Sequence, residues 1–168
     1  MEPHAAPPPV VVGFDGSEGS RRALEWAAAE CELRHCALVV VHADRWAPVT
    51  LELPAFQDEE RTEERILEEG IELAKNGRPA LDVRGLRAPP PAGESLIEAA
   101  RGASLLVVGS RGLRHLEQMV IGSVSRYCVD HAHCPVVVVR PPEAPAAPEA
   151  REGPEERPPD LPDVQRHA

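Results

Sequence analysis

Short runs of valine, leucine and alanine recur along the chain, and segments with apolar residues at helical spacing separate them. The strongest runs cover residues 10–14, 37–43, 104–108 and 135–140. A continuous apolar run of this length is typical of a strand that is buried on both faces. Because strands that alternate with helices are joined by right-handed crossovers, the pattern predicts a parallel sheet with helices on both faces. The predicted fold class is therefore α/β.

The segments between these runs have the periodicity of helices that pack on a sheet. Their apolar spacing predicts helices over residues 17–34, 58–75, 93–101 and 123–131. Asn76-Gly77 ends the second of these helices. Residues 80–88 form a further candidate strand, whose arginines favour an edge position in the sheet.

Size and composition limit the classes of protein that the chain can be. With 168 residues it has room for one domain, and with 42% hydrophobic but only 3% aromatic residues its core must consist of Val, Leu, Ile and Ala. A formal net charge of -10 argues against nucleic acid and anionic membranes as partners. The first residues, MEPHAAPPP, lack the basic and apolar parts of a signal peptide, and no apolar run is long enough to span a membrane. We therefore expect a cytoplasmic protein.

Prolines are concentrated at the two ends of the chain. Of the 19 prolines, four lie within residues 1–9 and eight within residues 141–168. The latter stretch has seven carboxylates, three arginines and almost no large apolar side chains, so it cannot bury enough surface to offset its ordering entropy. The sequence predicts a disordered N-terminus over residues 1–8, one folded domain over 9–141 and a disordered acidic tail over 142–168.

The cysteines and histidines give no strong metal or redox signal. The four cysteines are too sparse for the framework of a secreted protein, and we expect reduced thiols. Cys128, His131, His133 and Cys134 fall within seven residues, as in some zinc sites. We expect no metal there, because a predicted helix carries the first two side chains whereas a strand begins at the last. His42, inside a predicted strand, is expected to be a hydrogen-bonded core residue rather than a base.

Two segments should lie beyond the carboxyl ends of strands, where ligands bind in sheets of this type. The first covers residues 13–20 and reads GFDGSEGS. In this segment Asp15 could bind a ribose hydroxyl or the metal ion of ATP, and Ser17 could cap the following helix. Asp-Gly-Ser also has the chemistry of an ordinary turn and cap, which the residues alone favour.

The second segment runs from Gly109 to Ser123 and reads GSRGLRHLEQMVIGS. Gly109 and Gly112 would let the main chain approach phosphate oxygens, and Ser123 offers a hydroxyl at a helix start. Lys75 is the one lysine of the chain, so the segment lacks the lysine of a nucleoside-triphosphatase loop, and it also lacks the compact GxGxxG of a dinucleotide fold. Arg111 is a candidate for phosphate contact, although arginines in loops are usually solvated.

The glycine spacing of this second segment resembles a known signature. Gly109-x-x-Gly112, followed after nine residues by Gly122-Ser123, is similar to the ATP-binding signature of the universal stress protein family. The resemblance extends to VVVGFDGSEGSRRAL, VVVHA and CPVVVVR, and it covers residues 9–141 in the order of the family. It implies an adenine nucleotide alpha hydrolase-like fold with strand order 3-2-1-4-5, and a homodimer through the last strand.

The resemblance also implies a site for an adenine nucleotide, namely ATP accompanied by Mg²⁺. Asp15 would lie beside the sugar and base, and the backbone of Ala43 would contact adenine. Phe14 and the prolines at 89–91 depart from the family pattern. These departures bear on the affinity for the nucleotide more than on the fold. The site residues expected from the motifs and the resemblance together are Asp15, Ser17, Ala43, Gly109, Arg111, Gly112, Gly122, Ser123, Val124 and Ser125.

Three functions fit these features. The leading one is a nucleotide-binding regulatory protein, without catalytic residues, that acts in stress adaptation through dimerisation or contacts with a partner. Slow ATP hydrolysis or nucleotidyl transfer at the same site is the enzymatic alternative, but the sequence offers it no clear general base and no lysine in the loop. The third is a nucleotide-free assembly module of the same family, against which the intact glycine spacing argues.

Overall fold

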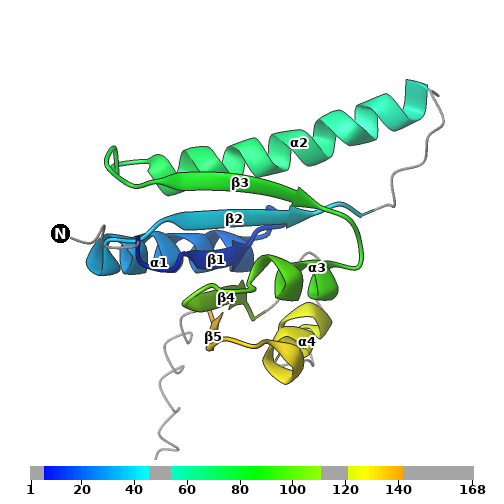
Figure 1. The fold of residues 1–168 in the computed structure, drawn as a ribbon. Coiled ribbons are helices and arrows are strands. Elements are labelled where there is room, and N and C mark those ends of the chain that lie inside the picture. Colours follow the sequence, from blue (N-terminus) through cyan, green and yellow to red (C-terminus); the bar gives the residue numbers. More distant parts are fainter. Residues whose placement is uncertain (1–5, 46–53, 111–120, 142–168) are drawn as a thin grey trace, which may run out of the picture.

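A single parallel sheet organises the fold. The computed structural model describes residues 6–45, 54–110 and 121–141, and these form five strands in the order β3-β2-β1-β4-β5 (Figure 1). The α/β class, the parallel sheet and the strand order expected from the sequence are confirmed. The elements are β1 (Val10–Gly13), α1 (Glu18–Arg34), β2 (Leu38–Ala43), α2 (Pro54–Lys75), β3 (Val83–Ala88), α3 (Ala92–Ala99), β4 (Leu105–Gly109), α4 (Ser123–His131) and β5 (Val136–Val139).

β1 is the central strand and pairs on both sides. Val11 lies opposite Val39 of β2 on one side and Leu106 of β4 on the other. The side chains of Val10, Val11 and Val12 are fully buried. Each of the two faces of the strand packs against its own helical layer. Burial on both faces explains why the strand is a continuous apolar run and does not alternate with polar residues.

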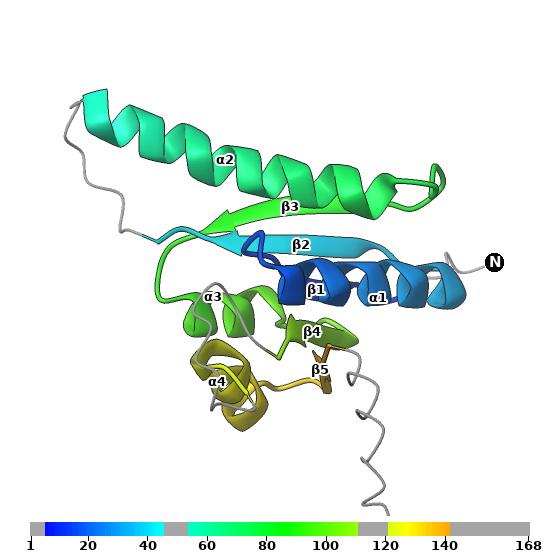
Figure 2. The same ribbon diagram turned by 180° about the vertical axis from the view of Figure 1, so that it is seen from behind.

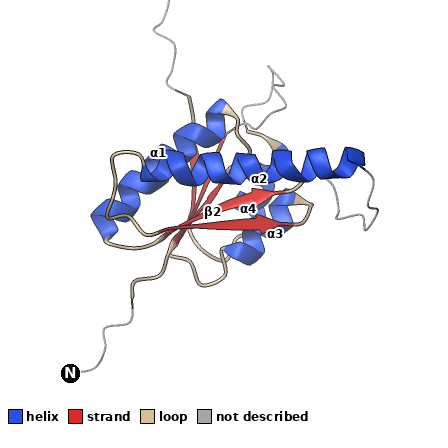
Figure 3. Ribbon diagram, turned by 90° about the horizontal axis from the view of Figure 1, so that it is seen from above, coloured by secondary structure: helices blue, strands red, loops and turns tan. Residues whose placement is uncertain are grey.

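Two helical layers cover the sheet (Figure 3). α1 and α2 pack on the face to which Val12 contributes, and α3 and α4 pack on the face to which Val11 contributes. α1 lies behind the sheet in Figure 1 and in front of it in Figure 2, where the view is reversed. Each layer is held by a separate apolar cluster, so the sheet forms the boundary between two cores.

The starts of α2 and β3 differ most from the sequence-based expectation, and they do so for local reasons. α2 begins at Pro54 rather than at residue 58, since proline at the first helical position loses no intrahelical hydrogen bond. β3 begins at Val83 rather than at residue 80, because a turn in which the Leu81 N–H donates to the Arg78 carbonyl precedes it. Gly77, with a φ of +73°, follows the end of α2 as predicted.

The end of β4 passes unusually close to the start of α1. A Cβ atom on Gly109 would lie 2.6 Å from the backbone carbon and oxygen of Gly19. Because the obstructing atoms are backbone on a capped helix, they cannot move aside as a flexible side chain can. The absence of a side chain at Gly109 is therefore a packing requirement of the fold.

We predict that Gly109→Ala lowers the free energy of unfolding by about 1–3 kcal/mol through overpacking. Urea denaturation of the purified chain measures this change. Gly13→Ala is the matched control, because its Cβ would meet side-chain atoms rather than backbone, those of Leu96 from 3.1 Å and of Val108 at 3.7 Å. An equal loss of stability in both variants would contradict the prediction.

Candidate functional site

The site is expected where the two halves of the sheet meet. The chain moves outward from β1 to β2 and β3, and then returns across the sheet to β4 and β5. The order of strands thus reverses between β1 and β4, and ligands of open α/β sheets bind beyond the carboxyl ends of the strands at such a point. The segments that leave β1, β2 and β4 all reach this edge of the sheet.

The exit from β1 is a tight turn that leads into α1. One Asp15 carboxylate oxygen accepts from the Ser17 N–H at 3.0 Å, and Gly16 has a φ of +78°. Ser17 is the N-cap of α1, and its hydroxyl accepts from the Ser20 N–H at 3.2 Å. The turn-and-cap interpretation of Asp15-Gly16-Ser17 is therefore confirmed, and the turn holds the half-buried Asp15 at the edge of the sheet.

The exit from β4 is tied to the start of α4. The Gly122 N–H donates to the Ser110 carbonyl at 2.7 Å, and the Ser110 N–H donates to the Val139 carbonyl at 2.8 Å. The buried Ser125 hydroxyl donates to the Gly109 carbonyl at 2.6 Å. The bonds of Gly122 and Ser125 hold the start of α4 against the end of β4, although the two elements are separated in sequence, and the bond to Val139 joins the end of β4 to β5.

The N-terminus of α4 has no side-chain cap. Gly122 occupies the N-cap position, and no side chain bonds the first turn. The first N–H groups of a helix have no acceptors within the helix, and together with the helix dipole they favour an anion. Ser123 and Val124, which begin the helix, are exposed. Small residues, and helix donors that have no partner in the described part of the chain, thus meet at the same edge as Asp15.

The backbone of Ala43 faces the exit from β1. In β2, the Val41 carbonyl accepts from the Phe14 N–H on the β1 side, whereas the Asp44 N–H donates to Ala88 on the β3 side. Backbone groups of a strand alternate between its two neighbours, so the N–H and C=O of Ala43 point to the β1 side. Among the described residues, neither group has a hydrogen-bond partner there.

The sequence-predicted residues thus divide into two groups. Arg111 and Gly112 lie outside the described residues. The other eight lie at the carboxyl edge of the sheet, on the turn after β1, at the ends of β2 and β4, and on the start of α4. They are Asp15, Ser17, Ala43, Gly109, Gly122, Ser123, Val124 and Ser125.

A buried polar cluster lies beside this edge, and only one of its members was noted from the sequence. His42 is 2% exposed and Glu63 is 7% exposed. His42 Nδ1 donates to the Phe14 carbonyl at 2.8 Å, and Nε2 lies 2.5 Å from Glu63 Oε2. The core position of His42 is therefore confirmed. Glu63 could have been recognised, because its position three and four residues before Ile66 and Leu67 places a carboxylate on the apolar face of α2.

His42, Glu63 and the neighbouring Asp44 are also possible metal ligands. Within the described ranges, their ligand atoms lie within 4.8 Å of one another. Asp44 is engaged by the Arg87 guanidinium through two bonds of 3.0 and 2.9 Å, and His42 and Glu63 bond each other. All three side chains are thus satisfied by protein groups, and a metal ion would have to displace these bonds.

The cysteines have the environment of core residues. Burial raises the pKa of the Cys31 thiol to about 12 and that of the Cys128 thiol to about 11. At neutral pH both thiols are protonated, whereas metal ligands and nucleophiles require the thiolate. His131 bonds the Tyr127 carbonyl through Nδ1 and stacks on the Tyr127 ring, while His133 is exposed.

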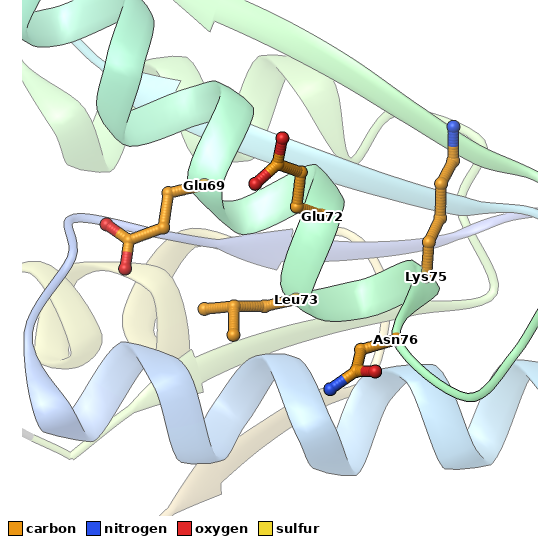
Figure 4. A pocket seen from close by; sticks show the side chains of 5 residues that line it. All are labelled: Glu69, Glu72, Leu73, Lys75 and Asn76. Atoms are coloured by element: carbon orange, nitrogen blue, oxygen red, sulfur yellow. The ribbon is translucent and has the colours of Figure 1, made fainter.

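A shallow hollow on the surface lies away from this edge. Figure 4 shows the side chains that line it, which come from the last turns of α2 and the residue that follows. Because α2 runs back from the carboxyl edge of the sheet to its amino edge, its last turns lie at the far end from the strand exits. The lining residues are Glu69, Glu72, Leu73, Lys75 and Asn76.

The fold and the strand exits define an α/β protein of the doubly wound class, with its candidate site at the point where strand order reverses. The family model of the universal stress protein family matches residues 8–140. The chain therefore belongs to the universal stress protein family. Among the described residues, no helix combines the length and apolar composition that crossing a bilayer requires.

Relatives and solved structures agree with this assignment. Universal stress protein YxiE of Bacillus subtilis is 34% identical over 146 residues, which cover 78% of this chain and 97% of the relative. A universal stress protein solved in complex with cAMP is 28% identical with a TM-score of 0.64, covering 80% of this chain and 98% of that one. The universal stress protein of Archaeoglobus fulgidus in complex with dAMP is 22% identical with a TM-score of 0.61, covering 80% and 98%, and supports the fold.

We predict that Ser125→Ala lowers the free energy of unfolding by about 1–3 kcal/mol, because it leaves the Gly109 carbonyl without its buried donor. Ser123→Ala, two residues earlier on the same helix and exposed, should change stability by less than about 0.5 kcal/mol. Thermal and urea unfolding of both variants measure the difference. Equal stabilities of the two variants would mean that the Ser125 hydroxyl does not hold α4 against β4.

Proposed function

We propose that the chain binds an adenine nucleotide, ATP with Mg²⁺, at the carboxyl edge formed by the exits of β1, β2 and β4. The observation that carries the proposal is the pair of backbone groups on Ala43 that have no hydrogen-bond partner among the described residues, at the same edge as the start of α4, which no described side chain caps. One group donates and the other accepts, which matches the N1 acceptor and the N6 amino donor of adenine. The relative that binds cAMP, 28% identical, supports the same class of ligand.

Each part of the edge would contact a different part of the nucleotide. The Asp15 carboxylate, held by the Ser17 N–H, would accept from a ribose hydroxyl. The N–H groups of Ser123 and Val124 would bond phosphate oxygens, helped by the dipole of α4. Arg111 and Gly112 stay predicted contributors to the phosphate contacts.

Binding, rather than turnover, is the proposed activity. Lys75 is the one lysine of the chain, and it lies at the end of α2, at the opposite edge of the sheet from the strand exits. It therefore cannot stabilise a phosphoryl transition state at this edge. We infer a regulatory role in stress adaptation, in which the nucleotide stabilises one conformation that a protein partner prefers.

The proposed assembly is a cytoplasmic homodimer through β5. Among the described residues, β5 pairs only with β4, which leaves it at one edge of the sheet. Its four valines are half-buried, and an unpaired edge strand can bond a second copy of itself. Pairing of this kind would leave the exits of β1 and β2, at the centre of the sheet, accessible to the nucleotide.

Gly122→Glu tests the proposed site, because it places a negatively charged side chain where the phosphates would bind. We expect adenine nucleotide to be present in acid extracts of the purified chain, and ATP to bind in calorimetric titration. The variant should lose both while its thermal unfolding stays close to that of the parent chain. Val129→Glu is the matched control, since it adds the same charge to an exposed position later on α4 and should keep the nucleotide.

Three results would count against the proposal. If the parent chain carries no adenine nucleotide and gives no calorimetric signal with ATP, the nucleotide-free assembly module takes its place. If bound ATP turns over at about 1 s⁻¹ or faster, the chain is an enzyme with a rate in the usual enzymatic range. Loss of binding in Val129→Glu as well would place the phosphates elsewhere.

A further inference from the structure

The ladder between β1 and β2 stops one hydrogen bond early. The Phe14 N–H donates to the Val41 carbonyl at 2.8 Å, which continues the parallel ladder past the end of β1. In a regular parallel ladder the next bond would join the Ala43 N–H to the Phe14 carbonyl. That bond is absent among the described residues, and the Phe14 carbonyl instead accepts from His42 Nδ1 at 2.8 Å.

The His42 ring is fixed in this position from both sides. A carbonyl oxygen can only accept a hydrogen bond, so Nδ1 carries a proton and donates it to Phe14. On the opposite side of the ring, Nε2 lies 2.5 Å from Glu63 Oε2. Glu63 comes from α2, which packs against β2 and β3, and both side chains are more than nine-tenths buried. The imidazole therefore has no freedom to release the Phe14 carbonyl without breaking a second buried bond.

We propose that His42 is a positioning residue that makes the nucleotide site specific for adenine. By holding the Phe14 carbonyl, it leaves the Ala43 N–H available to a ligand. The Ala43 N–H and C=O then form a donor and acceptor pair at the strand edge. This inference rests on the proposed nucleotide function. It adds the residue that keeps the Ala43 N–H available to bond the adenine base.

The chemistry of two purines shows what this edge distinguishes. Adenine has an acceptor at N1 and a donor at N6, so it complements a backbone N–H beside a backbone C=O. Hypoxanthine has a donor at N1 and an acceptor at O6, so the same backbone pair faces a donor with its N–H and an acceptor with its C=O. A site that leaves buried polar groups unpaired rejects the wrong ligand more strongly than an apolar site does. If the Ala43 N–H were bonded to Phe14 instead, half of this discrimination would be lost.

Two double variants test the role of His42 directly. His42→Leu with Glu63→Leu removes the donor to Phe14 without leaving a buried carboxylate unpaired. His42→Asn with Glu63→Leu differs only at position 42, where the carboxamide N–H can still donate to Phe14. The readouts are calorimetric affinities for AMP, for inosine monophosphate and for ribose 5-phosphate, and the hydrogen-exchange rate of the Ala43 amide.

We expect the parent chain and the Asn variant to prefer AMP to inosine monophosphate by about tenfold or more, as one well-formed hydrogen bond allows. The Leu variant should lose most of this preference, keep its affinity for ribose 5-phosphate within about twofold, and exchange the Ala43 amide more slowly because the ladder closes. Ribose 5-phosphate reports on general damage to the site, which a loss of base recognition alone would leave unchanged.

The contradicting results are distinct for the two proposals. An unchanged preference for AMP in the Leu variant overturns the role of His42, whatever the exchange rate. Equal loss of AMP and ribose 5-phosphate affinity also overturns it, because His42 would then support the whole site. If the parent chain binds neither nucleotide, the proposed function fails. Separately, an unchanged exchange rate of the Ala43 amide in the Leu variant would show that His42 does not prevent the Ala43 N–H from bonding the Phe14 carbonyl.

Discussion

The pairing of β1 with both β2 and β4 is the interaction on which the rest of the structure depends. It places a strand of valines in the middle of the sheet, buried on both faces, so that each helical layer has a continuous apolar surface to cover. Because all the strands are parallel, the same pairing also brings their carboxyl ends to one edge. Fold stability and the position of the site therefore come from one set of backbone hydrogen bonds.

Much of the fold could be predicted from the sequence, because the residues that carry the signal act locally. The run at 10–14 has no polar alternation, which indicates a strand buried on both faces, and Ser17 has the chemistry of the helix cap that it forms. The strand order followed from the resemblance to the universal stress proteins rather than from any local pattern. Element ends were less predictable where a turn such as that at Arg78 decides them.

The remaining features depend on contacts between distant segments, which periodicity cannot report. Gly109 was predicted as a place for close approach to phosphate, whereas the structure also gives its missing side chain a packing role against Gly19 of α1. The His42 ring joins the β1 exit to α2 through Glu63, twenty-one positions further along the chain. No motif in the sequence marks this contact, because neither residue belongs to the glycine signature.

The candidate site is built mainly from backbone groups. Ala43 contributes its N–H and C=O, α4 contributes the donors of an uncapped first turn, and side chains such as Asp15 are fixed by their own turn. A site of this kind tolerates substitution of many side chains, provided that the strand exits and their small residues keep their positions. The buried pair of His42 and Glu63 is the exception, since there a side chain decides which backbone groups stay available.

The most direct measurement is a map of backbone amide chemical shifts in the ¹⁵N-labelled chain as ATP is added. We expect the largest changes after β1, at the end of β2, at the end of β4 and over the first turn of α4, with Ala43 and Gly122 among the most affected. Residues of the α2 hollow, such as Leu73, should change little. Largest changes around Leu73, or no changes anywhere at saturating ATP, would contradict a nucleotide site at the carboxyl edge of the sheet.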